Sequence, residues 1–95
     1  EVPLDIMGEC ARIIEVADFL AKNCSKLVLS DVGASAILAK AALRAAALNV
    51  HINTNLMDDA AQAAAFNERC ENLLGEPCAA AQKIYDEVAW ALHGA

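Results

Sequence analysis

The stretch from Val32 to about Ile52 constrains the fold most strongly, because it is apolar at almost every position of a helical wheel. A helix of this kind is typical of one that is surrounded by other protein. Its small side chains allow neighbouring helices to approach closely. Eight of these positions are Ala34, Ala36, Ala39, Ala41, Ala42, Ala45, Ala46 and Ala47. The segment therefore predicts a central helix that also pairs with another chain.

The residues before this segment predict one amphipathic helix and a connection. The helix runs from Pro3 to Lys22, because Pro3 suits a first helical turn and apolar residues recur at helical spacing. Its expected core stripe consists of Ile6, Cys10, Ile13, Ala17 and Leu20. Asn23 to Leu29 lacks such a stripe and is assigned to a connection, with an extended conformation possible over residues 27–29.

The second half of the chain predicts two further helices. Residues 53–55 (Asn-Thr-Asn) interrupt the apolar pattern, and Asp58 or Asp59 is expected to start a helix that Gly75 stops after Leu74. Pro77 then suits the first residue of a last helix, which ends at Gly94. The expected fold is all-α, with about four helices. Residues 1–95 form one unit of a helical-bundle domain that dimerises through the alanine-rich helix.

Composition narrows the classes of function. Seven Lys and Arg against 13 Asp and Glu give a net charge of -6, which argues against nucleic-acid binding. No apolar run reaches the roughly 18 residues of a membrane span, so no membrane partner is expected. The four cysteines have neither C-x-x-C spacing nor a histidine at a zinc-finger interval. We expect no metal, reduced thiols at Cys10 and Cys70 that act as small apolar groups, and a cytoplasmic setting.

The residues Ser30, Asp31 and Gly33 form the first candidate site, at the expected start of the central helix. Ser30 fits a helix N-cap and Asp31 a partner for the helix dipole. In the functional alternative, Gly33 admits a ligand close to backbone N–H groups while the Asp31 carboxylate accepts or donates a proton. The sequence leaves both interpretations open.

Asn49 and Asn53 form a second polar cluster at the other end of the same helix. They are one turn apart, so both amides can face one pocket, or they can satisfy the helix end itself. Asp31 and Asn49 are 18 residues apart, about 27 Å along a helix, so one small ligand cannot reach both within one chain. Either the clusters serve different purposes, or a second antiparallel subunit brings them together. Arg44 beside Lys40 either meets an anionic ligand or stays solvated.

Three ordered motifs carry a resemblance to a known family. They are LSDVGASA at residues 29–36, AAL at residues 41–43 and ALNVHIN at residues 47–53, with VPL at residues 2–4 leading into the first helix. In this order the chain resembles the formimidoyltetrahydrofolate cyclodeaminase and methenyltetrahydrofolate cyclohydrolase family. Members also carry an N-terminal half with a Pro-Gly-Gly-Gly-type turn, which is missing here. The chain thus looks like the C-terminal half of such a domain.

The resemblance implies an all-α homodimer that processes one-carbon units on tetrahydrofolate, and this chain is expected to do so only when the missing N-terminal half completes it. The reaction is cyclisation of 5-formimidoyltetrahydrofolate with ammonia release, or interconversion of methenyl- and formyltetrahydrofolate. Asp31 is then the catalytic candidate, with Ser30, Gly33, Asn49, Asn53 and Arg44 as substrate-binding candidates and with no cofactor. The alternative is a non-catalytic helical module that dimerises through the alanine-rich helix and Trp90.

Overall fold

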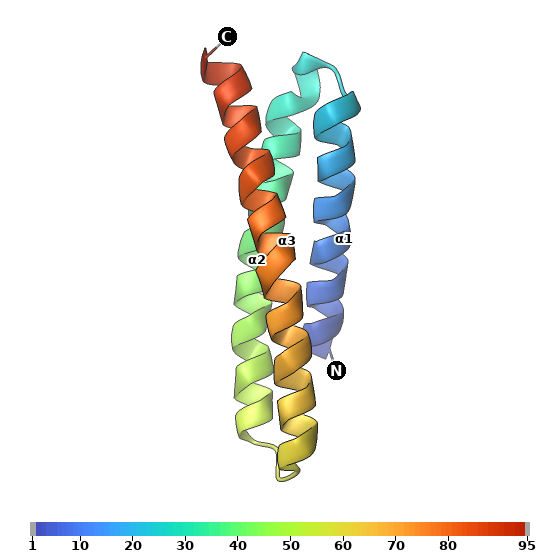
Figure 1. Ribbon diagram of the computed structural model, residues 1–95, viewed down its shortest axis with the longest axis vertical. Coiled ribbons are helices and arrows are strands. Elements are labelled where there is room, and N and C mark those ends of the chain that lie inside the picture. Colours follow the sequence, from blue (N-terminus) through green and yellow to red (C-terminus); the bar gives the residue numbers. More distant parts are fainter. Residues whose placement is uncertain (1, 95) are drawn as a thin grey trace.

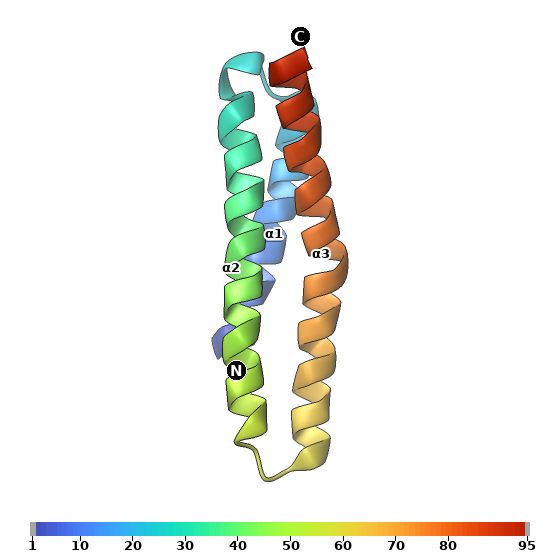
Figure 2. The same cartoon turned by 90° about the vertical axis from the view of Figure 1, so that its left-hand side faces the viewer.

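Two short connections fold the chain back on itself twice, so that three long helices run up, down and up beside one another (Figures 1 and 2). The computed structural model describes residues 2–94. Helix α1 spans Val2–Asn23, α2 spans Leu29–Asn55 and α3 spans Ala60–Gly94, while a single 3-10 turn, η1, covers Lys26–Val28 before α2. The all-α prediction is confirmed over the described residues, which contain no strand.

The prediction of about four helices is wrong, because the last two are one continuous helix. Gly75 does not adopt a left-handed conformation, and Pro77 lies inside α3. A proline there removes one backbone hydrogen bond and strains the turn before it. Packing offsets this strain, because α3 buries Cys70 before the proline and Ala81 and Ile84 after it in the same core.

Helix α1 buries a different stripe from the one expected. Cys10 and Ala17 are buried as predicted, but Ile6, Ile13 and Leu20 are 47%, 50% and 40% exposed. The core takes its α1 side chains instead from the neighbouring stripe of Leu4, Met7 and Ile14. Helix α1 is apolar over a wide arc, and only the part of that arc that faces both other helices is buried.

Helix α2 begins earlier and ends later than its sequence signals suggest. It begins at Leu29, and its N-cap is Val28, whose side chain makes no capping bond, so the prediction of a Ser30 cap is wrong. Residues 27–29 are helical rather than extended. At the other end α2 continues to Asn55, because the Thr54 hydroxyl reaches Asn67 Oδ1 of α3 at 2.9 Å and is buried there.

The start of α3 agrees with the prediction. The backbone N–H of Gln62 donates to Asp59 Oδ1 at 3.0 Å, which satisfies one of the free donors of the first turn. At the bottom of Figure 1, the end of α2 and the start of α3 extend beyond the start of α1 as a pair. Of the helices described, none combines the length and the apolar character that crossing a membrane requires.

Candidate functional site

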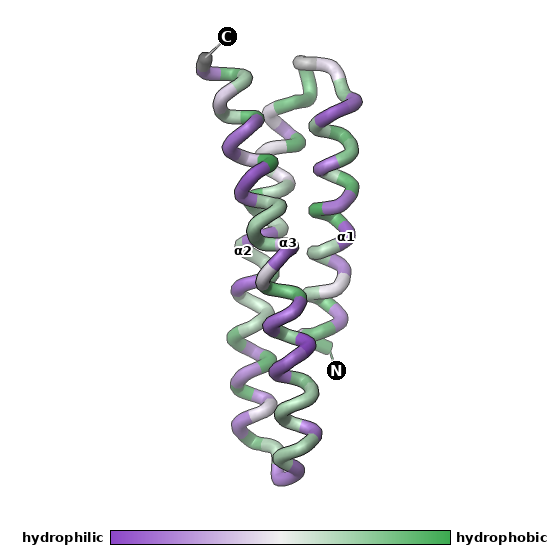
Figure 3. Tube along the Cα trace, in the orientation of Figure 1, coloured by the Kyte–Doolittle hydropathy of each residue, from purple (hydrophilic) through white to green (hydrophobic). Residues whose placement is uncertain are grey.

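One side of the bundle, formed by α1 and α2, exposes an unusual amount of apolar surface. Ile13, Val16 and Leu20 of α1 and Leu38 of α2 are between 40% and 68% exposed. Strongly hydrophilic residues recur along α1 and α3 but are sparse in the first half of α2 (Figure 3). Contiguous exposed apolar surface of this kind marks a place where a ligand or another chain binds.

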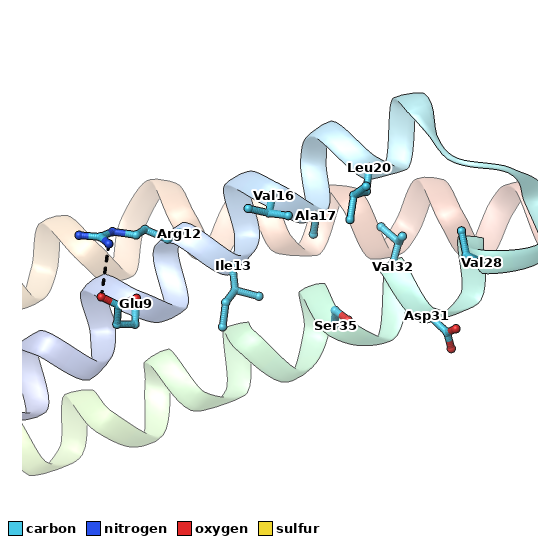
Figure 4. A pocket seen from close by; sticks show the side chains of 10 residues that line it. All are labelled: Glu9, Arg12, Ile13, Val16, Ala17, Leu20, Val28, Asp31, Val32 and Ser35. Atoms are coloured by element: carbon cyan, nitrogen blue, oxygen red, sulfur yellow. Dashed lines mark ion pairs between the residues drawn. The ribbon is translucent and has the colours of Figure 1, made fainter.

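The groove between α1 and α2 deepens into a hollow of about 420 Å³ at the end of the bundle near η1. Its walls are mainly apolar, and Leu20 and Val32 point toward each other across it (Figure 4). Pockets of this size, with apolar walls and a few polar groups, are typical of small-molecule sites. The lining residues are Glu9, Arg12, Ile13, Val16, Ala17, Leu20, Val28, Asp31, Val32 and Ser35.

Asp31 lies at the rim of this hollow, in the first turn of α2. Its carboxylate points away from α1 (Figure 4). The N-terminal end of a helix carries a partial positive charge, which attracts negative groups. At the opposite end of the groove, Arg12 forms an exposed ion pair with Glu9 at 3.5 Å. The hollow thus has an apolar centre with a carboxylate at one end and a paired cation at the other.

The other predicted site residues do not line this hollow. Ser30 is exposed beside Asp31, while Arg44, Asn49 and Asn53 are exposed farther along α2. Because α2 is one continuous helix from Leu29 to Asn55, the separation of about 27 Å between Asp31 and Asn49 holds in the folded chain. One chain therefore does not bring the two polar clusters together.

Gly33 has a clear structural reason to be glycine. It is buried, and a Cβ atom there would lie 2.8 Å from Val88 Cγ1 and 3.1 Å from Val88 Cβ of α3. The missing side chain lets α2 and α3 approach closely. Gly33 thus faces α3 rather than the hollow.

Sequence reasoning missed several residues of the groove. Ser35 lies one turn after Asp31 and lines the same hollow, and Ile13, Val16 and Leu20 form its α1 wall. The available signal was the width of the apolar arc of α1, which exceeds what one packed face can bury. Assigning Ile13 and Leu20 to the core hid this wall.

The folded chain shifts the pKa of the Cys10 thiol. Burial raises the pKa of the Cys10 thiol, and the negative charge of Glu9 raises it further. A thiol with a raised pKa is a poor nucleophile, so Cys10 suits a packing role. Among residues 2–94, no group of three or more His, Cys, Asp or Glu side chains is arranged to hold a metal ion.

Comparison with known proteins identifies the family of this chain. The family model described as formiminotransferase-cyclodeaminase matches residues 1–72. The chain is also 38% identical over 88 residues to methenyltetrahydrofolate cyclohydrolase of Methylorubrum extorquens. These matches show that the chain belongs to the cyclodeaminase and cyclohydrolase family of folate one-carbon metabolism.

The two chains differ in length. The aligned region covers 93% of this chain but 42% of that cyclohydrolase, so this chain spans less than half the length of the relative. The comparison with solved structures gives no match.

Proposed function

We propose that this chain takes part in a one-carbon reaction on tetrahydrofolate: the hydrolysis of 5,10-methenyltetrahydrofolate to the 10-formyl compound, or the ring closure of 5-formimidoyltetrahydrofolate with loss of ammonia. The observation that carries the proposal is the position of Asp31. It combines a carboxylate at the rim of an apolar hollow with membership of the family. The identity to a cyclohydrolase favours the first reaction.

The chemistry needs a negative group near the reacting carbon. Water attacks the cationic methenyl carbon in the first reaction, and a proton must leave that water; in the second, the departing nitrogen must gain a proton. A carboxylate at Asp31 stabilises the cationic carbon and transfers the proton. The apolar walls of the hollow accept the flat rings of the folate, and Ser30 positions the carboxylate.

The remaining candidates bind the two ends of the folate, the pterin edge and the glutamate tail. Asn49 and Asn53 offer amide donors and acceptors, which suit the hydrogen-bonding edge of a pterin. Arg44 offers a cation for the carboxylates of the glutamate tail. Because these residues lie far from Asp31 on the same helix, we propose that the working site also needs a second polypeptide surface, from another copy or from the rest of the domain. The proposed setting is the cytoplasm, with no resident cofactor.

Two assays test the proposal. The first monitors hydrolysis of methenyltetrahydrofolate through the loss of its absorbance, and the second measures ammonia release from formimidoyltetrahydrofolate. We expect little or no activity from this chain alone. Activity should appear when the part of the M. extorquens cyclohydrolase that this chain does not align with is added as a separate polypeptide. In that complex, Asp31→Asn should lower kcat about 100-fold or more, without a matching loss in the thermal midpoint.

Asp58→Asn is the matched control, because Asp58 is exposed in the connection after α2. It should leave kcat unchanged. Equal turnover in Asp31→Asn and Asp58→Asn would remove Asp31 from the mechanism. A complex that forms, folds and binds no folate would favour the alternative of a non-catalytic interaction module, for which the exposed apolar side of α1 and α2 is the supporting observation.

A further inference from the structure

A second cleft lies between α1 and α3, and the proposed reaction does not use it. This α1–α3 cleft has a volume of about 490 Å³, and its walls are residues at helical spacing within 4–12 of α1 and 69–73 of α3. Glu9 and Arg12 are the two residues that line both this cleft and the hollow between α1 and α2. The α1–α3 cleft is therefore a separate candidate site, and its volume is typical of a small-molecule pocket.

The cleft carries two charges of each sign. Glu9 and Arg12 pair with each other along α1 at 3.5 Å (Figure 4). Asp5 of α1 and Arg69 of α3 also line the cleft, but neither forms an ion pair with any described residue. The cleft thus presents one unpaired carboxylate and one unpaired guanidinium on two neighbouring helices.

We infer that the α1–α3 cleft binds a free α-amino acid with an apolar side chain, whose carboxylate pairs with Arg69 and whose ammonium group pairs with Asp5. A ligand with one sign of charge is disfavoured, because an anion meets two carboxylates in the cleft and a cation meets two guanidinium groups. An α-amino acid carries both signs on adjacent carbons. Its carboxylate matches the two parallel donors of an arginine, and the Asn72 amide offers a further donor.

The rest of the lining accounts for the apolar side chain of the ligand. Leu4, which is 1% exposed, and the partly buried Leu73 line the cleft beside the charged groups. An apolar ligand side chain that covers these leucines loses contact with water, which favours binding. The cleft therefore combines recognition of two charges with an apolar surface.

Gly8 keeps the cleft open. It lies in the wall that α1 contributes, its φ angle is not positive, and a Cβ atom there would meet nothing within 4 Å. Neither the backbone conformation nor packing within the chain therefore requires glycine, although glycine weakens a helix relative to alanine. A larger side chain at this position would occupy the cleft, so the glycine leaves room for a ligand.

An NMR titration of the isotope-labelled chain with L-leucine tests the site. We expect saturable shifts at the Gly8 amide and at the side-chain N–H groups of Arg69 and Asn72. The dissociation constant should be about 1–10 mM, as expected for a ligand of so few atoms. Shifts that do not saturate, or that fall outside the cleft, would overturn the inference.

Two analogues of leucine test the need for both charges. 4-Methylpentanoate lacks the ammonium group and isopentylamine lacks the carboxylate, so each should bind at least about fivefold more weakly than leucine. Asp5→Asn should weaken the binding of leucine but not that of 4-methylpentanoate. If the native chain binds 4-methylpentanoate as tightly as leucine, the ammonium group has no partner in the cleft and the inference fails.

Arg69→Gln tests the partner of the carboxylate. It should raise the dissociation constant of leucine about tenfold or more. Lys83→Gln is the matched control, because it removes one positive charge from the same helix. Lys83 pairs with Glu87 at 4.0 Å and lies 14 residues after Arg69, about 21 Å along α3. Equal losses in the two variants would reduce the effect to net charge and overturn the assignment of Arg69.

Gly8→Leu tests whether the open space is the site. It should abolish saturable binding of leucine and raise the thermal midpoint, because leucine favours a helix more than glycine does. Gly75→Leu makes the same exchange at a helical glycine that also has nothing within 4 Å of its Cβ and does not line the cleft. It should leave leucine binding unchanged.

Saturable binding that persists in Gly8→Leu would place the ligand elsewhere and overturn the inference. Circular dichroism checks that each variant remains helical. Because these measurements contain no folate, they distinguish a failure of the amino-acid site from a failure of the proposed reaction.

Discussion

The two long sides of α2 are similar in sequence, but one is buried against α3 and the other is exposed. The side toward α3 is closed: Gly33 contacts Val88, the Lys40 ammonium donates to Gln82 Oε1 at 2.7 Å, and the Thr54 hydroxyl reaches Asn67 at 2.9 Å. The outer side also consists of alanine, leucine and isoleucine, but it stays open. The difference teaches that apolar content marks a contact surface, and that the presence of fitted partners decides which surface becomes core.

The largest difference between the two sides should appear when a leucine is truncated on each. Leu43 is fully buried, while Leu38, five residues earlier on the outer side, is 68% exposed. Leu43→Ala should lower the free energy of unfolding by about 2–5 kcal/mol, because it leaves a cavity. Leu38→Ala should change it by less than about 0.5 kcal/mol in the monomer. Urea denaturation at low protein concentration measures both.

Repeating the denaturation of Leu43→Ala and Leu38→Ala at high protein concentration sharpens the comparison of the two sides. If the outer side pairs with a second copy, the loss caused by Leu38→Ala should grow with concentration, since dimerisation adds to stability by mass action. Equal losses for Leu43→Ala and Leu38→Ala at every concentration would contradict the division of α2 into a closed and an open side.

The next largest effect on the free energy of unfolding should come from replacing two glycines by alanine. Gly33→Ala should lower the free energy of unfolding by about 1–3 kcal/mol, because the added methyl group meets Val88 at 2.8 Å. Gly75→Ala should raise it by about 0.5–1 kcal/mol, because its Cβ meets nothing within 4 Å and alanine favours a helix. Thermal unfolding monitored by circular dichroism measures both changes.

A second substitution tests whether the contact with Val88 is what destabilises the Gly33→Ala variant. Val88→Ala removes the contacting methyl groups, so the double variant should lose less than the sum of the two single variants. Destabilisation by Gly75→Ala would instead show that the chain bends at residues 75–77 and that α3 is two helices.

The smallest predicted effect is a change in the pH dependence of the thermal midpoint, caused by Cys10 in the buried part of α1. Burial raises the pKa of Cys10 in the folded chain, so folding favours the protonated thiol. The contribution is complete below the ordinary pKa of a cysteine and is lost as the pH rises through the raised value. The thermal midpoint should therefore fall at alkaline pH more in the native chain than in Cys10→Ala. Parallel curves for the two proteins between pH 8 and 10.5 would show that Cys10 does not contribute.

Several features of the site could be found from sequence, and others could not. The position of Asp31 in the first turn of α2 and the separation of Asp31 from Asn49 follow from helical spacing alone. The α1 wall of the hollow does not, because Ile13 and Leu20 share their apolar character with the buried Leu4 and Ile14. Hydrophobicity gives a helix its apolar arc, and only the direction of its neighbours divides that arc into core and surface.

The sequence by itself determined that this protein is all-α, that its central helix is alanine-rich, and to which family it belongs, because these depend on local spacing and ordered motifs. The tertiary structure decided that Gly75 and Pro77 lie within one helix and that Gly33 serves the contact with Val88. It also decided which apolar side stays open. Helix breakers act through local energies of a few kcal/mol. The burial of α3 on both sides of Pro77 against the other two helices outweighs them.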